Sequence, residues 1–432
     1  MTMKLALLGC DDETLALVQG AIADGDHALV AAYDTAEFQS QVQALAPSAR
    51  LDEDWETLLL GNLADVVIVS RGRLDPSRST GFAADERRND QLRKLVQEAV
   101  PLVVIHPGCE ALVGFELDMI RGDSKGIILP FIPGRNQAAL EAMVNLVRGS
   151  ETSLVGSVEQ VLFEREMTSR SRPRVLAQLA RDVSLAREFL GPIHKMSATG
   201  AAVGETVDPL GPRSKTLPPL ENLAVHLSGE VPFAARWMVM PAAHAEKLQV
   251  TVMGARGRAV LSQSSGVSPS AVVKVSGGGS SEMATSEFPS QNEFSAALNI
   301  VSQKLAGHDQ QESSWLAACR DVEVAESVDR SLARGRAVEF FGEEHSEEQS
   351  FKGVMAVGGC LMLSVTFVAV LVAAAVEGLQ LPLRESALWR AWPFYLLVPI
   401  VLFLLLQLLQ GVAKRPEKQS QNEEARQNLP AR

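Results

Sequence analysis

The chain has 432 residues, of which 46% are hydrophobic and 21% charged, a globular composition rather than a disordered one. Lys and Arg number 40 and Asp and Glu 52, so the net charge is -12, and an acidic chain without a basic stripe argues against nucleic-acid binding. The four cysteines are scattered and form no CxxC pair, so we expect neither a disulfide framework nor a metal site.

The first 134 residues alternate short apolar runs with helical patterns. Expected strands cover residues 4–8, 28–33, 66–69, 102–105 and 126–129, and expected helices cover 13–23, 91–99 and 111–121. Strands that alternate with helices predict parallel pairing, so residues 1–134 should form an α/β domain with a doubly wound sheet. A sheet of this kind binds ligands outside the carboxyl ends of its strands.

The turn after the first expected strand is where a dinucleotide would bind. Of the G-x-G-x-x-G fingerprint only the first glycine, Gly9, is kept, and Asp11, Asp12 and Glu13 follow it. Three carboxylates suit the N-terminus of a helix, but they repel a diphosphate. One like-charge pair at ~5 Å costs roughly 3 kcal/mol at an effective dielectric constant of about 20. The fold therefore suits a dinucleotide, whereas the turn does not.

Asp34 ends the second expected strand. A carboxylate at this place can accept a hydrogen bond from a ribose hydroxyl, and a solvated strand-end carboxylate is an equal alternative. Gly9 and Asp34 are therefore the candidate cofactor-binding residues.

Two polar segments interrupt the pattern. Residues 71–88 carry five arginines and form the most basic stretch before the C-terminal apolar runs. A solvated surface loop is the first interpretation of this segment, and contact with anionic ligands or lipid head groups is the second. Residues 262–290 are rich in Ser and Gly, which predicts a flexible loop between strands.

Several stretches, taken in order, resemble the glucose–fructose oxidoreductase / inositol dehydrogenase (Gfo/Idh/MocA) family. They cover residues 52–59, 64–68, 134–135, 179–191, 195–198, 221–227 and 248–260. The resemblance extends to about residue 262, and more loosely to about 340. It implies a Rossmann-like domain over residues 1–134, then an α+β domain over 135–340 with an open, largely antiparallel sheet. In this family that sheet carries substrate and oligomer contacts, which implies a homo-oligomer.

The resemblance also implies chemistry, namely hydride transfer between NAD(P) and a sugar or polyol carbon. The family uses a Glu-Lys-Pro stretch and a second-domain histidine. Here the stretch is Ile105-His106-Pro107, so His106 replaces the lysine, while Arg181 falls on the histidine and Ser184 on a nearby aspartate. Arginine does not deprotonate in proteins and cannot shuttle a proton. His106 could, because its reference pKa is near 6.5, and a strand-end histidine bonded to local backbone is the alternative.

Two charge-free runs, residues 353–376 and 391–413, predict transmembrane helices, because each exceeds the ~30 Å hydrocarbon core. Buried core helices are the alternative. Residues 341–352 should link the runs to the α+β domain, and residues 414–432 should form a polar tail. Flanking Lys and Arg residues, and an N-terminus without a signal-peptide pattern, predict a multi-pass membrane protein whose soluble part is cytoplasmic.

Three hypotheses follow from these patterns. The first is a membrane-anchored oxidoreductase-like protein that has lost nicotinamide-dependent turnover and acts as a binding or scaffolding module. Its partners would be the lipid bilayer and a small-molecule or nucleotide ligand. The second is an active NAD(P)-dependent oxidoreductase on a sugar or polyol, with His106 in the role of the lysine. The third is a structural membrane protein whose sheet drives oligomerisation.

Overall fold

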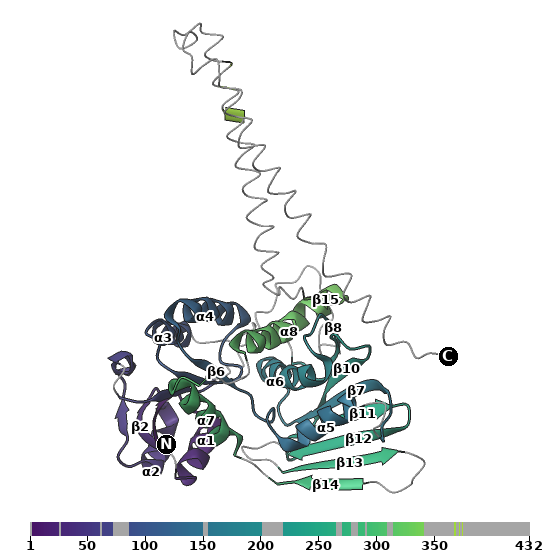
Figure 1. The fold of residues 1–432 in the computed structure, drawn as a ribbon, viewed down its shortest axis with the longest axis horizontal. Coiled ribbons are helices and arrows are strands. Elements are labelled where there is room, and N and C mark those ends of the chain that lie inside the picture. The colour runs from purple at the N-terminus through teal and green to yellow at the C-terminus, as the bar shows by residue number, and fades with distance from the viewer. Residues whose placement is uncertain are drawn as a thin grey trace, which may run out of the picture. The chain divides into compact units, whose positions relative to one another are not determined.

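The computed structural model of the chain describes residues 2–25, 27–60, 63–71, 86–149, 154–200, 219–264, 270–277, 284–289, 292–308 and 314–340, together with residues 367, 368, 371 and 374. Residues Met1–Gly342 form one compact unit and residues Glu343–Arg432 a second. The first unit contains two sheets, each flanked by helices (Figure 1).

The first sheet has six parallel strands in the order β3-β2-β1-β4-β5-β6. These are β1 (Met3–Leu8), β2 (His27–Tyr33), β3 (Arg50–Asp52), β4 (Val66–Val69), β5 (Leu102–Ile105) and β6 (Ile128–Phe131). β4 and β5 are buried throughout, as expected for strands covered on both faces. The predicted parallel sheet is confirmed, and the strand order reverses between β1 and β4. The carboxyl ends of these two strands therefore form the topological switch point of the sheet.

Helices cover both faces of this sheet. They are α1 (Asp12–Ala23), α2 (Gln39–Leu45), α3 (Glu86–Gln97) and α4 (Ala111–Ser124), with 3-10 helices at Ala36–Phe38 and Trp55–Leu60. Side chains of β1 alternate between two cores: Leu5 and Leu7 belong to one, and Ala6 and Leu8 to the other. Each core contains helical side chains, so both faces of the sheet are closed.

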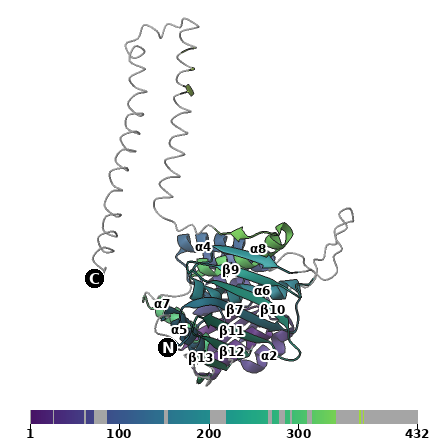
Figure 2. The ribbon, with the colours of Figure 1, turned by 90° about the vertical axis from the view of Figure 1, so that its right-hand side faces the viewer.

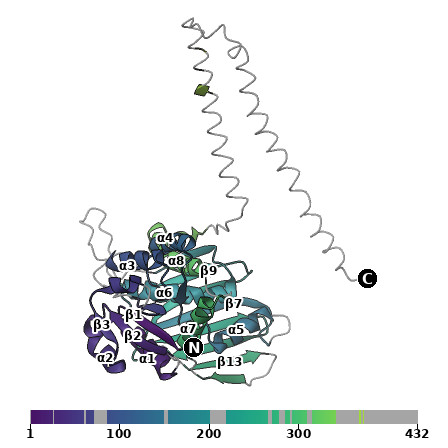
Figure 3. The ribbon, with the colours of Figure 1, turned by 60° about the vertical axis from the view of Figure 1, so that its left-hand side comes forward.

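Two helices from late in the chain complete these cores. α7 (Glu293–Leu305) lies beside α1 (Figure 3), and its Phe294 packs edge-on against Phe131 of β6 with ring centroids 5.0 Å apart. α8 (Trp315–Arg334) packs along α4, where Trp315 Nε1 donates to the carbonyl of Gly114 at 2.8 Å. Residues after position 134 therefore belong to the core of the first sheet as well as to the second.

The second sheet has nine strands in the order β14-β13-β12-β11-β7-β10-β9-β8-β15, and Figure 2 views it. The strands are β7 (Val158–Met167), β8 (Lys195–Thr199), β9 (Ala224–Ser228), β10 (Ala234–Pro241), β11 (Lys247–Gly254), β12 (Gly257–Ser264), β13 (Ala271–Gly277), β14 (Ala284–Phe288) and β15 (Val338–Glu339). Among these described strands, β7 and β10 pair in parallel and the other neighbours pair antiparallel. The sheet is thus mixed, with the antiparallel majority that the resemblance implies.

The core of the second sheet lies on the face covered by α5 (Ala138–Arg148) and α6 (Arg172–Leu190). Phe163 of β7 meets Phe189 of α6 edge-on, with ring centroids 6.0 Å apart. α6 begins with Pro173 in its first turn, where the missing N–H costs no helical hydrogen bond, and Gly191 follows its last residue. This helix carries the positions of Arg181 and Ser184, which it places between the two sheets.

The interpretation of residues 262–290 as a flexible loop was wrong where the structure describes them. Residues Ala271–Gly277 and Ala284–Phe288 form the strands β13 and β14. Ala271 and Val273 are buried against the core, and β-branched residues at alternating positions favour a strand. In the sequence, the abundance of Ser and Gly made this short alternation of buried and exposed residues hard to recognise.

The predicted transmembrane runs lie almost entirely outside the described residues. Phe367, Val368, Leu371 and Ala374, all in the first run, are helical and exposed. Among the residues that the structure describes, no helix is both long and apolar enough to span a membrane. The two spans therefore stay predictions from the sequence.

Candidate functional site

The turn after β1 begins at Gly9, whose φ of +77° lies in the region that favours glycine. Its N–H donates to the carbonyl of Tyr33 at 2.9 Å. A Cβ added at this position would lie 2.3 Å from Ser70 Oγ and 2.4 Å from Arg88 Nη2. Glycine is therefore required, and the space beside it holds a hydroxyl and a guanidinium instead of open solvent.

The N-terminus of α1 is capped by the turn itself. Asp11 accepts hydrogen bonds at Oδ1 from the Thr14 backbone N–H at 2.7 Å and from Thr14 Oγ1 at 2.6 Å. A helix N-terminus is a ready anion site, because its first N–H groups lack helical partners. Here the Asp11 carboxylate is the anion at that place, so a pyrophosphate would have to displace it.

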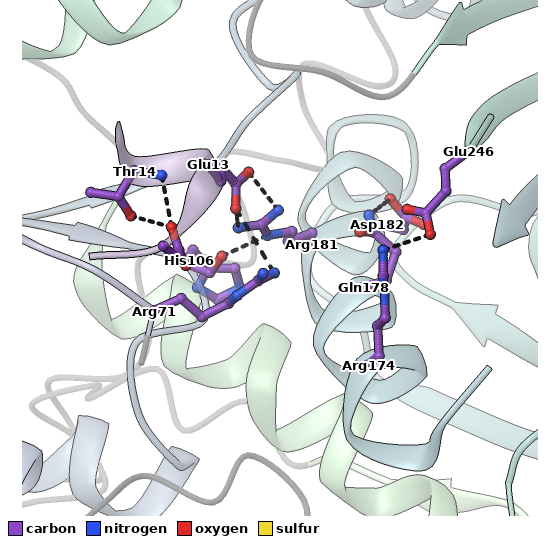
Figure 4. Close-up of polar contacts among 10 residues, drawn as sticks. Glu13, Thr14, Arg71, His106, Arg174, Gln178, Arg181, Asp182 and Glu246 are labelled. Carbon is purple, nitrogen blue, oxygen red and sulfur yellow. Dashed lines mark hydrogen bonds and ion pairs between the residues drawn. The ribbon is translucent and has the colours of Figure 1, made fainter. Parts of the chain in front are cut away.

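Glu13 joins the turn to the second sheet's helix. Arg181 of α6 donates from Nη1 to Glu13 Oε1 at 2.8 Å and from Nη2 to Oε2 at 2.7 Å, a two-point ion pair (Figure 4). The third donor of Arg181, Nε, bonds the carbonyl oxygen of His106 at 2.7 Å. Burial raises the pKa of Glu13, but the charge and hydrogen bonds of Arg181 outweigh it and hold that pKa below 4.5. The pair is therefore ionised at neutral pH.

His106 lies at the end of β5, and 3% of its surface is exposed. Burial, and then the neighbouring charge of Arg181, lower the pKa of His106 to about 3. Its ring is hydrogen-bonded to the backbone of Ala180 in α6, and its Nε2 is buried without a partner in the described part of the chain. A general base works best with a pKa near the operating pH, so a neutral histidine this weakly basic is poorly suited to proton transfer.

Asp34 has both carboxylate oxygens engaged by α3. Arg87 donates to Oδ1 at 2.9 Å and Gln91 donates to Oδ2 at 2.7 Å. The backbone of Asp34 is left-handed, with φ of +52°, a conformation that aspartate tolerates better than most residues. The structure thus gives Asp34 protein partners at the position where the sequence left a ribose contact and a solvated carboxylate as equal alternatives.

Ser184 lies one turn after Arg181 and faces α8. Its Oγ donates to Asp321 Oδ2 at 2.5 Å, and Arg187 donates to the same oxygen at 2.8 Å. Burial raises the pKa of Asp321, while Arg187 and the Ser184 hydroxyl act against that rise. Ser184 and Arg187 therefore hold α6 against α8 through Asp321.

The structure brings His106 and Arg181 together, places Gly9 beside Ser70 and Arg88, and gives Asp34 a separate contact with α3. The local sequence pattern does not indicate Glu13 as the partner of Arg181, Asp321 as the partner of Ser184, or Arg71 beside Glu13. The pairing of Glu13 with Arg181 could have been inferred from the residue types. A buried acidic residue and a buried arginine each destabilise the fold alone, but they compensate each other's charge when they are adjacent.

No family model matches the chain, and no curated protein matches it. Solved structures do. An oxidoreductase from Agrobacterium radiobacter in complex with NAD+ has a TM-score of 0.59 at 15% identity, covering 78% of this chain and 98% of its own. An aldose-aldose oxidoreductase from Caulobacter crescentus complexed with glycerol gives 0.61 at 15%, covering 79% and 100%. A 3-ketoreductase from Actinomadura kijaniata, solved with NADP, gives 0.59 at 11%, covering 77% and 98%.

These comparisons define the class of fold. The structural match covers nearly the whole length of each of these oxidoreductase chains. In this chain it spans the Rossmann-like parallel sheet and the mixed sheet that follows. At 11–15% identity the likeness is one of fold.

Proposed function

We propose that this chain is a membrane-anchored protein with the fold of Gfo/Idh/MocA oxidoreductases that has lost nicotinamide-dependent turnover and acts as a binding or scaffolding module. The ion pair between Glu13 and Arg181 carries the proposal. It places an arginine where the family uses a histidine, and it fixes that arginine to the turn that should hold a pyrophosphate. His106, the candidate for proton transfer, is buried and neutral.

The test is isothermal titration of NADH and NADPH into the full chain in detergent micelles. We expect no binding at millimolar cofactor, because the carboxylate of Asp11 occupies the helix N-terminus and Asp12 adds a second negative charge that repels a diphosphate. The double variant Asp11→Gly/Asp12→Ala removes both carboxylates and should gain nucleotide affinity. Micromolar binding to the natural chain would contradict the proposal.

The alternative is a working NAD(P)-dependent oxidoreductase acting on a sugar or polyol. It is favoured by the fold likeness to oxidoreductases solved with NAD+ and with NADP. Under this alternative His106 would handle the proton, and the cofactor would bind at Gly9 and Asp34. Reduction of NAD+ or NADP+ during a screen of sugars and polyols, abolished by His106→Ala, would establish it.

A homo-oligomer built on the open face of the nine-stranded sheet belongs to the same proposal. Leu162, Met238 and Met253 point away from the helix-covered core and are partly exposed. Light scattering of the full chain should give a mass of at least two copies, and Leu162→Glu should shift it toward one copy. Glu164→Gln, on the same strand face, is the matched control. A single-copy mass for the natural chain would exclude this contact.

A further inference from the structure

The topological switch point of the first sheet carries basic side chains. β1 ends at Leu8 and leads to Gly9, and β4 ends at Val69 and leads to Ser70 and Arg71. β1 and β4 are hydrogen-bonded neighbours, so their carboxyl ends bring these residues to one place. Ser70 Oγ and Arg88 Nη2 both lie next to Gly9. Open parallel sheets bind ligands at such a point.

Arg71 makes no hydrogen bond to the part of the chain that the structure describes. Its nearest carboxylate oxygen there is Glu13 Oε2, 3.9 Å from Nη1, and both oxygens of Glu13 are already bonded to Arg181 (Figure 4). Its Nε is buried and has no acceptor among the described residues. The side chain as a whole is 22% exposed.

Most of the charges around Arg71 are already paired with one another. Glu13 and Arg181 form their two-point ion pair, and Arg174 donates to Glu246 at 2.7 Å. Burial and then the charge of Arg181 lower the pKa of Arg71, whereas Glu13 and Asp11 act in the opposite direction. A guanidinium offers a fork of donors that matches a carboxylate or phosphate, and a buried charged donor left without an acceptor is costly.

We propose that a small ligand bearing a single oxyanion group, a carboxylate or a phosphate, binds at the switch point through Arg71, with Ser70 and Arg88 beside it. The inference rests on the proposed binding role of this site and names its ligand class. One oxyanion on the β4 side meets the guanidinium. A diphosphate reaching the α1 side would meet Asp11 and Asp12 as well.

The experiment is isothermal titration of the full chain in detergent micelles, in phosphate-free buffer, with inorganic phosphate in one arm and D-gluconate in the other. We expect saturable binding in at least one arm. Phosphate alone would identify a phosphate group as the ligand chemistry, gluconate alone a carboxylate, and both a general oxyanion site. Absence of binding at 10 mM, roughly the weak end of specific recognition, in both arms would overturn the inference.

Arg71→Met should weaken the binding by about ten- to a hundredfold, as expected for a hydrogen-bonded ion contact. The affinity of Arg71→Lys should lie between those of Arg71→Met and the natural chain, since lysine keeps the charge but lacks the forked pair of donors. Arg93→Met removes a surface arginine that already binds Glu116 and Asp90, so it controls for net charge and should bind as the natural chain does. Methionine removes a buried cation, so the fold should survive, and an unchanged melting temperature will check this.

Equal binding by Arg71→Met and the natural chain would overturn the assignment. This outcome is separable from failure of the proposed function. Loss of nicotinamide binding is tested by titration of NADH and NADPH, a separate measurement from the binding of phosphate or gluconate.

Discussion

Replacing Arg181 by methionine should lower the free energy of unfolding by about 3–5 kcal/mol. The change removes one partner of a largely buried ion pair and leaves the Glu13 carboxylate, 23% exposed, without its two hydrogen bonds. The carbonyl of His106 also loses its donor. Urea denaturation of the full chain in detergent, followed by tryptophan fluorescence, measures the effect.

The double variant Glu13→Gln/Arg181→Met is the control for this result. Because it removes the orphaned carboxylate, it should recover part of the loss. With Glu13→Gln measured alone as well, the effect of the double variant minus the effects of both single variants gives the coupling energy. Additive effects of the two changes would show that the pair contributes nothing beyond its separate side chains.

The pH dependence of the same pair has a definite sign. The pKa of Glu13 is lower in the folded chain than its ordinary 4.5, so the ion pair stabilises the fold fully above about pH 4.5. This contribution is lost as the pH falls below that value, through the folded pKa. In Arg181→Met, burial still raises the pKa of Glu13, and of the opposing groups only the more distant charge of Arg71 remains. The gap in stability between the natural chain and this variant should therefore narrow on acidification, and a constant gap from pH 7 to pH 3 would contradict the assignment.

Replacing Asp182 by alanine should cost a similar amount, about 3–5 kcal/mol. Asp182 lies on α6 with 1% of its surface exposed, and Arg165 of β7 donates to it from Nε at 2.9 Å and from Nη2 at 2.5 Å. Trp237 of β10 donates its indole N–H to the same carboxylate at 2.8 Å. Alanine would leave the buried guanidinium of Arg165 unpaired between α6 and the second sheet.

Two milder variants separate the parts of this cluster. Trp237→Phe removes one donor and keeps most of the ring, so it should cost about 1–2 kcal/mol. Asp182→Asn keeps the shape of the side chain and removes its charge. Its loss in the free energy of unfolding should therefore lie between those of Trp237→Phe and Asp182→Ala. The same urea titration measures all three, and a loss under about 1 kcal/mol for Asp182→Ala would show that Arg165 finds another partner or solvent.

The sequence by itself determined the first sheet. The apolar runs at 66–69 and 102–105 match β4 and β5 residue for residue, because a strand buried on both faces reads as a continuous apolar run. The family resemblance, not residue type alone, singled out His106 and Arg181. The mixed second sheet followed from the family resemblance, not from local pattern.

Only the tertiary structure decided what those positions do. α7 returns from residue 293 to complete the first core, and local pattern does not record such long-range packing. Glu13 and Arg181 are 168 residues apart in the sequence. Burying either charge without the other would be unfavourable. The fold brings them within hydrogen-bond distance, where two costly charges become one neutral pair. The contact between Glu13 and Arg181 is therefore a property of packing, because Coulomb energy depends on distance in space and not along the chain.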